Sequence, residues 1–139
     1  MAISILRVLI VEDEAVIAYA LRDCLEVAGV QVVGLAATEA TARHLSARER
    51  PDAAVVDVML REGSGLDLAR SLVEQGTTVL FATGNAEDSI ARCGLQNVAY
   101  VSKPYDMRSI GTALRAAGHL RATGTMPEWA PVGMHQLRA

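Results

Sequence analysis

The stretch that decides the fold is Ala53-Ala54-Val55-Val56-Asp57-Val58-Met59-Leu60. Seven of its eight residues are apolar, and small or β-branched residues dominate, which is typical of a strand buried on both faces of a parallel sheet. In the middle of such a strand, Asp57 would be strongly destabilising because burial removes its hydration. At the carboxyl end it would instead face the crevice where open α/β sheets bind ligands. Taken alone, Asp57 fits a structural strand end as well as a functional site.

Apolar strands and amphipathic helices alternate on both sides of this stretch. Glycines and capping residues, such as Gly29 after one helix and Thr38 before the next, mark the boundaries. The alternation predicts an α/β fold in which a five-stranded parallel sheet, connected by right-handed crossovers, carries helices on both faces. The predicted strands are 5–11, 30–36, the stretch 53–60 with Asp57 toward its carboxyl end, 78–83 and 98–102, and the predicted helices are 15–28, 39–47, 66–74, 86–93 and 107–121.

The pattern ends after residue 121. Residues 122–139 show neither helical nor strand periodicity, and Trp129 lies between Pro127 and Pro131. We therefore expect one domain over residues 1–121, followed by a tail of residues 122–139 that is a loose terminus or docks Trp129 on the surface. We also expect no DNA-binding module after residue 121.

Composition excludes several classes of function. A chain of 139 residues can bury one proper core, and a content of 51% hydrophobic but 4% aromatic residues predicts a core of aliphatic side chains. The net charge of −3 gives no basic surface for direct binding of nucleic acid. No apolar run approaches the roughly 18 residues of a membrane span. Without a leader sequence or paired cysteines (Cys24 and Cys93 are far apart), we expect a cytoplasmic protein with free thiols and no membrane insertion.

Polar side chains follow four of the predicted strands. They are Glu12-Asp13-Glu14 after the first strand, Asp57 at the end of the third, Thr83 after the fourth and Lys103 after the fifth. Because the carboxyl ends of parallel strands meet at one edge of a sheet, these groups are expected to share one crevice. Glu14 fits better as an acid in the first turn of the following helix, where the helix dipole favours it.

Such a crevice would suit a metal ion and a phosphoryl group. Two carboxylates about 4 Å apart repel by roughly 4 kcal/mol at an effective dielectric constant of about 20, so a proton or a cation must lie between them. Oxygen ligands favour Mg²⁺. Lys103 and Thr83 would contact phosphoryl oxygens, which leaves Asp57 as the nucleophile.

These motifs resemble the receiver domain of two-component response regulators, which has a flavodoxin-like (βα)5 topology. The resemblance covers residues 5–121 and rests on Val11-Glu12-Asp13-Glu14, Asp57, Thr83 and Lys103-Pro104. It implies that Asp57 accepts the phosphoryl group, that Thr83 is the switch hydroxyl and that Lys103 binds the phosphoryl group. It also implies a Mg²⁺ site made of Glu12, Asp13, Asp57 and the backbone carbonyl of Met59. Tyr100 matches a switching aromatic, although a plain core aromatic would look the same.

A further motif narrows the resemblance. The stretch Phe81-Ala82-Thr83-Gly84-Asn85 is similar to a Phe-Ala-Thr-Gly signature of single-domain receivers associated with alphaproteobacteria and with kinases of the HWE type. This implies a stand-alone phosphoacceptor signalling protein, not an enzyme, that takes its phosphoryl group from a histidine kinase or a histidine phosphotransfer protein. It would act as a monomer or weak dimer and pass the signal to an unknown protein partner or by onward phosphotransfer.

Two other functions stay open at this point. A phosphohydrolase with an aspartyl nucleophile would need a second acid two residues after Asp57, where this chain has Met59. A flavodoxin-like binding module would need a loop rich in Ser, Thr and Gly after the first strand, where Glu12-Asp13-Glu14 would repel a phosphate.

Overall fold

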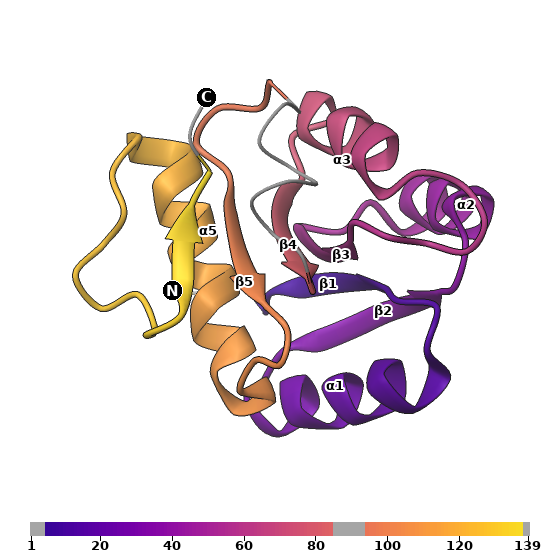
Figure 1. Ribbon diagram of the computed structural model, residues 1–139, viewed down its shortest axis with the longest axis horizontal. Helices are drawn as coiled ribbons and strands as arrows, with labels where there is room; N and C mark the ends of the chain where they lie inside the picture. The colour runs from indigo at the N-terminus through magenta and orange to yellow at the C-terminus, as the bar shows by residue number, and fades with distance from the viewer. Residues whose placement is uncertain (1–4, 85–93, 138–139) are drawn as a thin grey trace.

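A computed structural model describes residues 5–84 and 94–137 of the chain. Its centre is one six-stranded sheet in the order β2-β1-β3-β4-β5-β6 (Figure 1). The strands are β1 (Arg7–Val11), β2 (Gln31–Ala36), β3 (Ala53–Asp57), β4 (Thr78–Thr83), β5 (Ala99–Ser102) and β6 (Met134–Gln136). The helices are α1 (Ala15–Val27), α2 (Glu39–Glu49), α3 (Gly65–Glu74), the 3₁₀ turn η1 (Met107–Ser109) and α5 (Ile110–Thr123).

The first five strands form the predicted parallel sheet. Neighbouring pairs from β2 through β5 are all parallel, and the Asp57 strand lies between β1 and β4. The flavodoxin-like α/β fold is therefore confirmed, with one strand more than predicted. The helix predicted over residues 86–93 lies outside the described residues.

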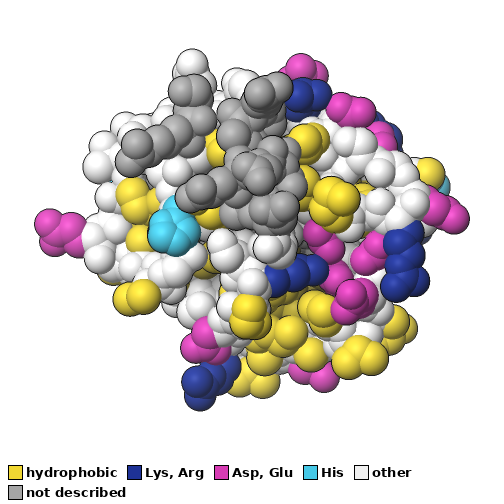
Figure 2. Space-filling view, in the orientation of Figure 1, with side chains coloured by type: hydrophobic (Ala, Val, Ile, Leu, Met, Phe, Trp, Pro, Cys, Tyr) yellow, Lys and Arg dark blue, Asp and Glu magenta, His cyan; other side chains and the backbone are white. Residues whose placement is uncertain are grey.

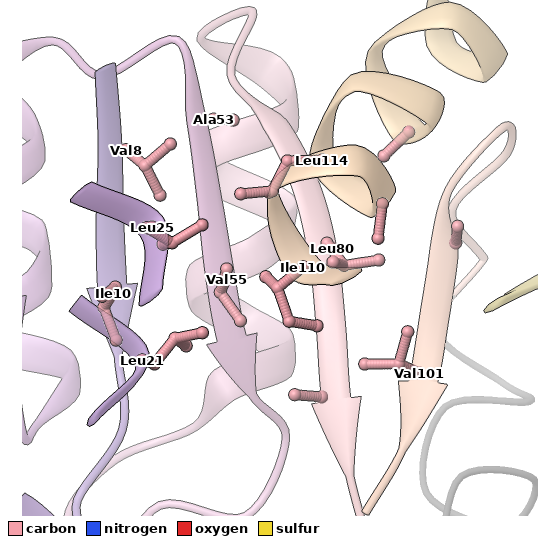
Figure 3. Close-up of a cluster of buried hydrophobic side chains, with 14 of the residues drawn as sticks. Val8, Ile10, Leu21, Leu25, Ala53, Val55, Leu80, Val101, Ile110 and Leu114 are labelled. Carbon is pink, nitrogen blue, oxygen red and sulfur yellow. The ribbon is translucent and has the colours of Figure 1, made fainter. Parts of the chain in front are cut away.

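Alternating side chains of the strands build two cores, one on each face of the sheet. On one face Ile10, Val55 and Leu80 pack against α1 and α5, as Figure 3 shows. On the other face Val56 and Phe81 lie in a second cluster with residues of α2 and α3. Since β3 contributes to both clusters, its residues are buried throughout, as a central parallel strand requires.

The helix boundaries follow from local capping. Thr38 accepts a hydrogen bond from the Thr41 backbone N–H at the start of α2, and Ser64 does the same for Asp67 at the start of α3. After α1, Gly29 has φ +83°, the left-handed conformation predicted for a helix end. Among the described helices, none combines the length and apolar character needed to cross a membrane.

The C-terminal segment corrects the prediction of an irregular tail. Residues Met134–Gln136 form β6, which pairs antiparallel with β5. Met134 is buried with the α1/α5 cluster and Leu137 with the α2/α3 cluster, so the strand extends both cores at the sheet edge. A run of three residues is too short to show a period of two, and its pairing with β5 is set by tertiary contacts. Upstream, Trp129 is 53% exposed and lies edge-on to His119 of α5.

Candidate functional site

Three carboxylates meet at the carboxyl edge of the sheet. Glu12 and Asp13 follow β1, and Asp57 ends β3, the strand that pairs directly with β1. One ligand oxygen from each residue lies within 4.8 Å of the others. Glu12 and Asp57 are both only 6% exposed. Figure 2 shows acidic side chains gathered beside basic ones on this face, with a hydrophobic patch over α1 next to them.

Lys103 connects two of these acids. Its Nζ lies 2.9 Å from Asp57 Oδ2 and 3.1 Å from Glu12 Oε2. The backbone positions this side chain, because the Lys103 N–H donates to the Thr83 carbonyl at 2.8 Å and so continues the β4–β5 ladder past its end. One ammonium thus faces two buried carboxylates, and Asp13 adds a third negative group beside them.

Burial and charge change the pKa values of this cluster. Desolvation by burial is the main cause that raises the pKa of Glu12 to about 7, and the neighbouring Asp57 adds to the effect while Lys103 opposes it. Burial lowers the pKa of Lys103, but its hydrogen bonds to Asp57 and Glu12 outweigh this and raise the pKa to about 12. Lys103 is therefore a fixed cation, whereas Glu12 can hold a proton near neutral pH.

The loop after β3 supplies backbone donors to the other carboxylate oxygens. The Met59 N–H donates to Asp57 Oδ1 at 3.0 Å, and the Arg61 N–H donates to Asp13 Oδ2 at 2.8 Å. Met59 is 68% exposed, and the contact it makes with Asp57 is through its backbone N–H. Sequence reasoning missed the Arg61 contribution, because a backbone donor leaves no signal in residue type.

Thr83 lies close to this edge, and Tyr100 lies away from it. In the β3–β4 ladder Asp57 is opposite Ala82, so the fully buried Thr83 is one residue beyond Asp57 on the adjacent strand. Tyr100 is half-buried against the α2/α3 core, and its ring centroid is 5.3 Å from that of His135 in β6. The structure thus places Tyr100 at the β5–β6 pair and not among the carboxylates.

Tyr105 is a neighbour of the site that the sequence analysis did not single out. Its side chain packs against the α1/α5 core. Burial raises the pKa of Tyr105 to about 12, and the negative charge of Glu12 adds to the increase. Tyr105 follows Lys103-Pro104 directly and stays protonated at any physiological pH, so it borders the acids as a neutral group.

The donor set fits a hard divalent cation. Glu12, Asp13 and Asp57 offer oxygens from a site that carries three carboxylates against one lysine, and such a set is typical of Mg²⁺ rather than of Zn²⁺. A cation there would also offset the repulsion by Asp57, which adds to the effect of burial on the pKa of Glu12.

Fold and site together define a flavodoxin-like α/β domain with an acidic, lysine-bridged site at the carboxyl edge of its sheet. Residues 8–115 match the family model of the response regulator receiver domain, and the chain belongs to this family. Phosphorylation and Mg²⁺ binding are typical of the family, its members are signalling proteins, and they interact with histidine kinases or phosphotransfer proteins.

Known relatives agree with this assignment. The probable transcriptional regulatory protein TcrX of Mycobacterium tuberculosis is 36% identical over 121 residues, which cover 84% of this chain and 50% of that protein. The PhyR receiver domain of Erythrobacter litoralis has a similar structure, with a TM-score of 0.76, 27% identity and coverage of 88% of this chain and 96% of the other. The PhyR response regulator of Brucella abortus gives a TM-score of 0.68 and 28% identity over 87% of this chain and 53% of its own. The chain spans about half the length of the curated relatives that it matches.

Proposed function

We propose that this chain is a stand-alone phosphoacceptor: Asp57 takes a phosphoryl group from a phosphohistidine of a histidine kinase or phosphotransfer protein. The observation that carries the proposal is the lysine-bridged cluster of Glu12, Asp13 and Asp57. The chain would then signal to a protein partner or pass the phosphoryl group onward. The Phe-Ala-Thr-Gly signature of residues 81–84 supports a place in the single-domain subgroup of alphaproteobacteria.

In the proposed reaction an Asp57 carboxylate oxygen forms a bond to phosphorus. The P–N bond of the phosphohistidine breaks, and the imidazole leaves with the electron pair of that bond. Asp57 is held for this step at both oxygens, by the Met59 N–H at Oδ1 and by Lys103 Nζ at Oδ2. Attack by either oxygen leaves the other with its donor, so the carboxylate keeps its orientation.

The groups around Asp57 would stabilise the negative charge of the transferring phosphoryl group. Lys103 is a permanent cation within hydrogen-bond distance of Asp57, and its flexible side chain can follow the incoming phosphoryl oxygens. Thr83 is the proposed donor to another phosphoryl oxygen, from the adjacent strand end. Glu12, Asp13, Asp57 and the Met59 carbonyl are the proposed Mg²⁺ ligands, and the metal would neutralise negative charge on the phosphoryl group.

Tyr100 is the proposed second part of the switch. It lies three residues before Lys103 on β5, and its ring contacts His135 of β6. A movement of β5 that starts at Lys103 or Thr83 would reach this contact directly. The chain would then report phosphorylation at the β5–β6 edge.

The phosphohydrolase alternative receives no support from the site. The residue two positions after Asp57 is Met59, whose exposed thioether cannot transfer a proton. The acids that follow β1 likewise disfavour a phosphate-binding loop of the flavodoxin type.

A small phosphodonor tests the proposed function directly. Incubation of the wild type with acetyl phosphate and Mg²⁺ should add one phosphoryl group, seen by intact-mass spectrometry. The addition should not occur when Mg²⁺ is chelated before acetyl phosphate is added. Asp57→Asn should show no addition. Asp67→Asn is a matched control, because Asp67 is an exposed acid on α3 that pairs with Arg70. Equal phosphorylation of wild type and Asp57→Asn would sink the proposal.

A further inference from the structure

Glu39 opens α2 and contacts the loop that leaves the phosphoacceptor strand. Its Oε1 accepts a hydrogen bond from the Ser64 N–H at 2.7 Å, and its own N–H donates to the Glu62 carbonyl at 3.2 Å. Between these two bonds lies Gly63, at φ +95°, where a Cβ would collide with the Glu39 side chain. The first residue of α2 and the loop are therefore in direct backbone contact.

The Glu39 carboxylate is itself held in place. Its Oε2 accepts from Arg43 Nε at 2.7 Å, and Arg43 Nη1 donates to Ser71 Oγ of α3 at 2.8 Å. The Ser64 N–H, and after it Arg43, lower the pKa of Glu39, so the group stays ionised. A carboxylate at the start of a helix usually interacts with its own helix dipole. Here it is also fixed between α2, the loop and α3.

The same loop forms one wall of the acidic cluster. Its near end supplies the Met59 N–H to Asp57 and the Arg61 N–H to Asp13. Directly after the loop, Gly65 at the start of α3 approaches the Asp57 carbonyl oxygen so closely that a Cβ there would clash with it. The loop is thus fixed at the carboxylates on one side and by Glu39 through Ser64 on the other.

We propose that Glu39 is a positioning residue for the Mg²⁺ and phosphoacceptor site, which it orients through Ser64 and the loop of residues 58–64. This role rests on the proposed function of Asp57. Loss of Glu39 leaves the Ser64 N–H and the Arg43 guanidinium without their carboxylate partner. The loop then samples positions in which the Met59 and Arg61 N–H groups no longer align the two carboxylates.

The test is a titration of the full chain with Mg²⁺, in which amide chemical shifts in NMR spectra report the Kd. Labelling with acetyl phosphate is measured in parallel. Substituting a residue that orients metal ligands typically lowers metal affinity 10- to 100-fold. Glu39 is farther from the metal ligands than such residues, so Glu39→Ala should weaken Mg²⁺ binding about fivefold. Glu39→Gln keeps an oxygen that can accept the Ser64 N–H, so it should recover most of this loss. If Glu39 only stabilised the fold, Glu39→Ala and Glu39→Gln would have the same Kd for Mg²⁺.

Glu49→Ala is the matched control, since Glu49 lies at the other end of α2 and pairs with Arg7 and Arg48. Its Mg²⁺ Kd should equal that of the wild type. An unchanged Kd in Glu39→Ala, with Asp57 phosphorylated normally, would overturn the positioning role and leave the proposed function intact. Absence of phosphorylation in the wild type would overturn the proposed function and the positioning role together.

Discussion

The acidic cluster and the C-terminal strand both adjoin one short element, β5, the cluster at its carboxyl end and the strand along its edge, and different forces hold them. At the carboxyl end Lys103 joins Glu12 and Asp57 through charged hydrogen bonds in a nearly buried site. Along the free edge, β6 is held by backbone pairing and by two buried apolar side chains, Met134 and Leu137. Changes of charge should therefore act on the first region, and changes of apolar volume on the second.

Lys103→Met should have the largest effect, and it should be confined to the acidic region. Removing the ammonium leaves Glu12 and Asp57 facing each other, which we expect to destabilise the metal-free protein by about 2–3 kcal/mol. It should also slow labelling of Asp57 by acetyl phosphate about a hundredfold, since one charged donor to the phosphoryl group is lost. Urea unfolding and the labelling rate measure the two effects. Arg108→Met, which removes an 88% exposed arginine side chain, should change neither quantity.

Leu137→Ala should have the next largest effect and act only on the C-terminal region. Truncating a buried leucine at a sheet edge should lower the free energy of unfolding by about 2 kcal/mol, at the low end of core substitutions. The Mg²⁺ Kd should stay at the wild-type value. Val132→Ala is the control, because Val132 is fully exposed in the same segment. A large change in Mg²⁺ affinity in Leu137→Ala would show that the two regions are not independent.

The pH dependence of stability should come from the acidic region. The folded-state pKa of Glu12 rises from 4.5 to about 7, so between these values the folded state holds a proton that the unfolded state lacks. This proton stabilises the fold at low pH, and the stabilisation is lost as the pH rises through 7. Without divalent cations, the free energy of unfolding should be about 2 kcal/mol larger at pH 5 than at pH 8. Glu12→Gln should remove most of this difference, whereas a slope of the same size in that variant would assign it to another group.

His135→Ala should have the smallest effect. It removes the ring contact with Tyr100 on an exposed strand residue, which should cost about 0.5 kcal/mol. The informative measurement is the chemical shift of the Tyr100 ring with and without acetyl phosphate. If Tyr100 takes part in the switch, its shift on phosphorylation should differ between His135→Ala and wild type. If the Tyr100 shift responds to phosphorylation identically in both proteins, the response of Tyr100 does not depend on its contact with β6.

The sequence predicted the acidic region better than the C-terminal one for a physical reason. Parallel βαβ topology sends every strand's carboxyl end to one edge, so reading Glu12, Asp57 and Lys103 along the chain was enough to bring them together. No topological rule of this kind predicts the position of residues Met134–Gln136. Their pairing with β5 depends on which edge of the sheet is free and on the path of the preceding loop. The contact of Glu39 with Ser64 could not be predicted either, since it joins the first turn of α2 to the loop before α3, and only the folded sheet brings these two segments together.

The position of Trp129 has a spectroscopic consequence. It is the chain's single tryptophan, it belongs to the segment that leads to β6, and its ring packs edge-on against His119 of α5. Light absorbed selectively by indole is therefore re-emitted from the C-terminal region alone. An emission change on adding acetyl phosphate and Mg²⁺, absent in Asp57→Asn, would mean that an event at one end of β5 is sensed along its edge. Trp129 is thus an intrinsic optical probe that tests whether phosphorylation of Asp57 reaches the C-terminal segment.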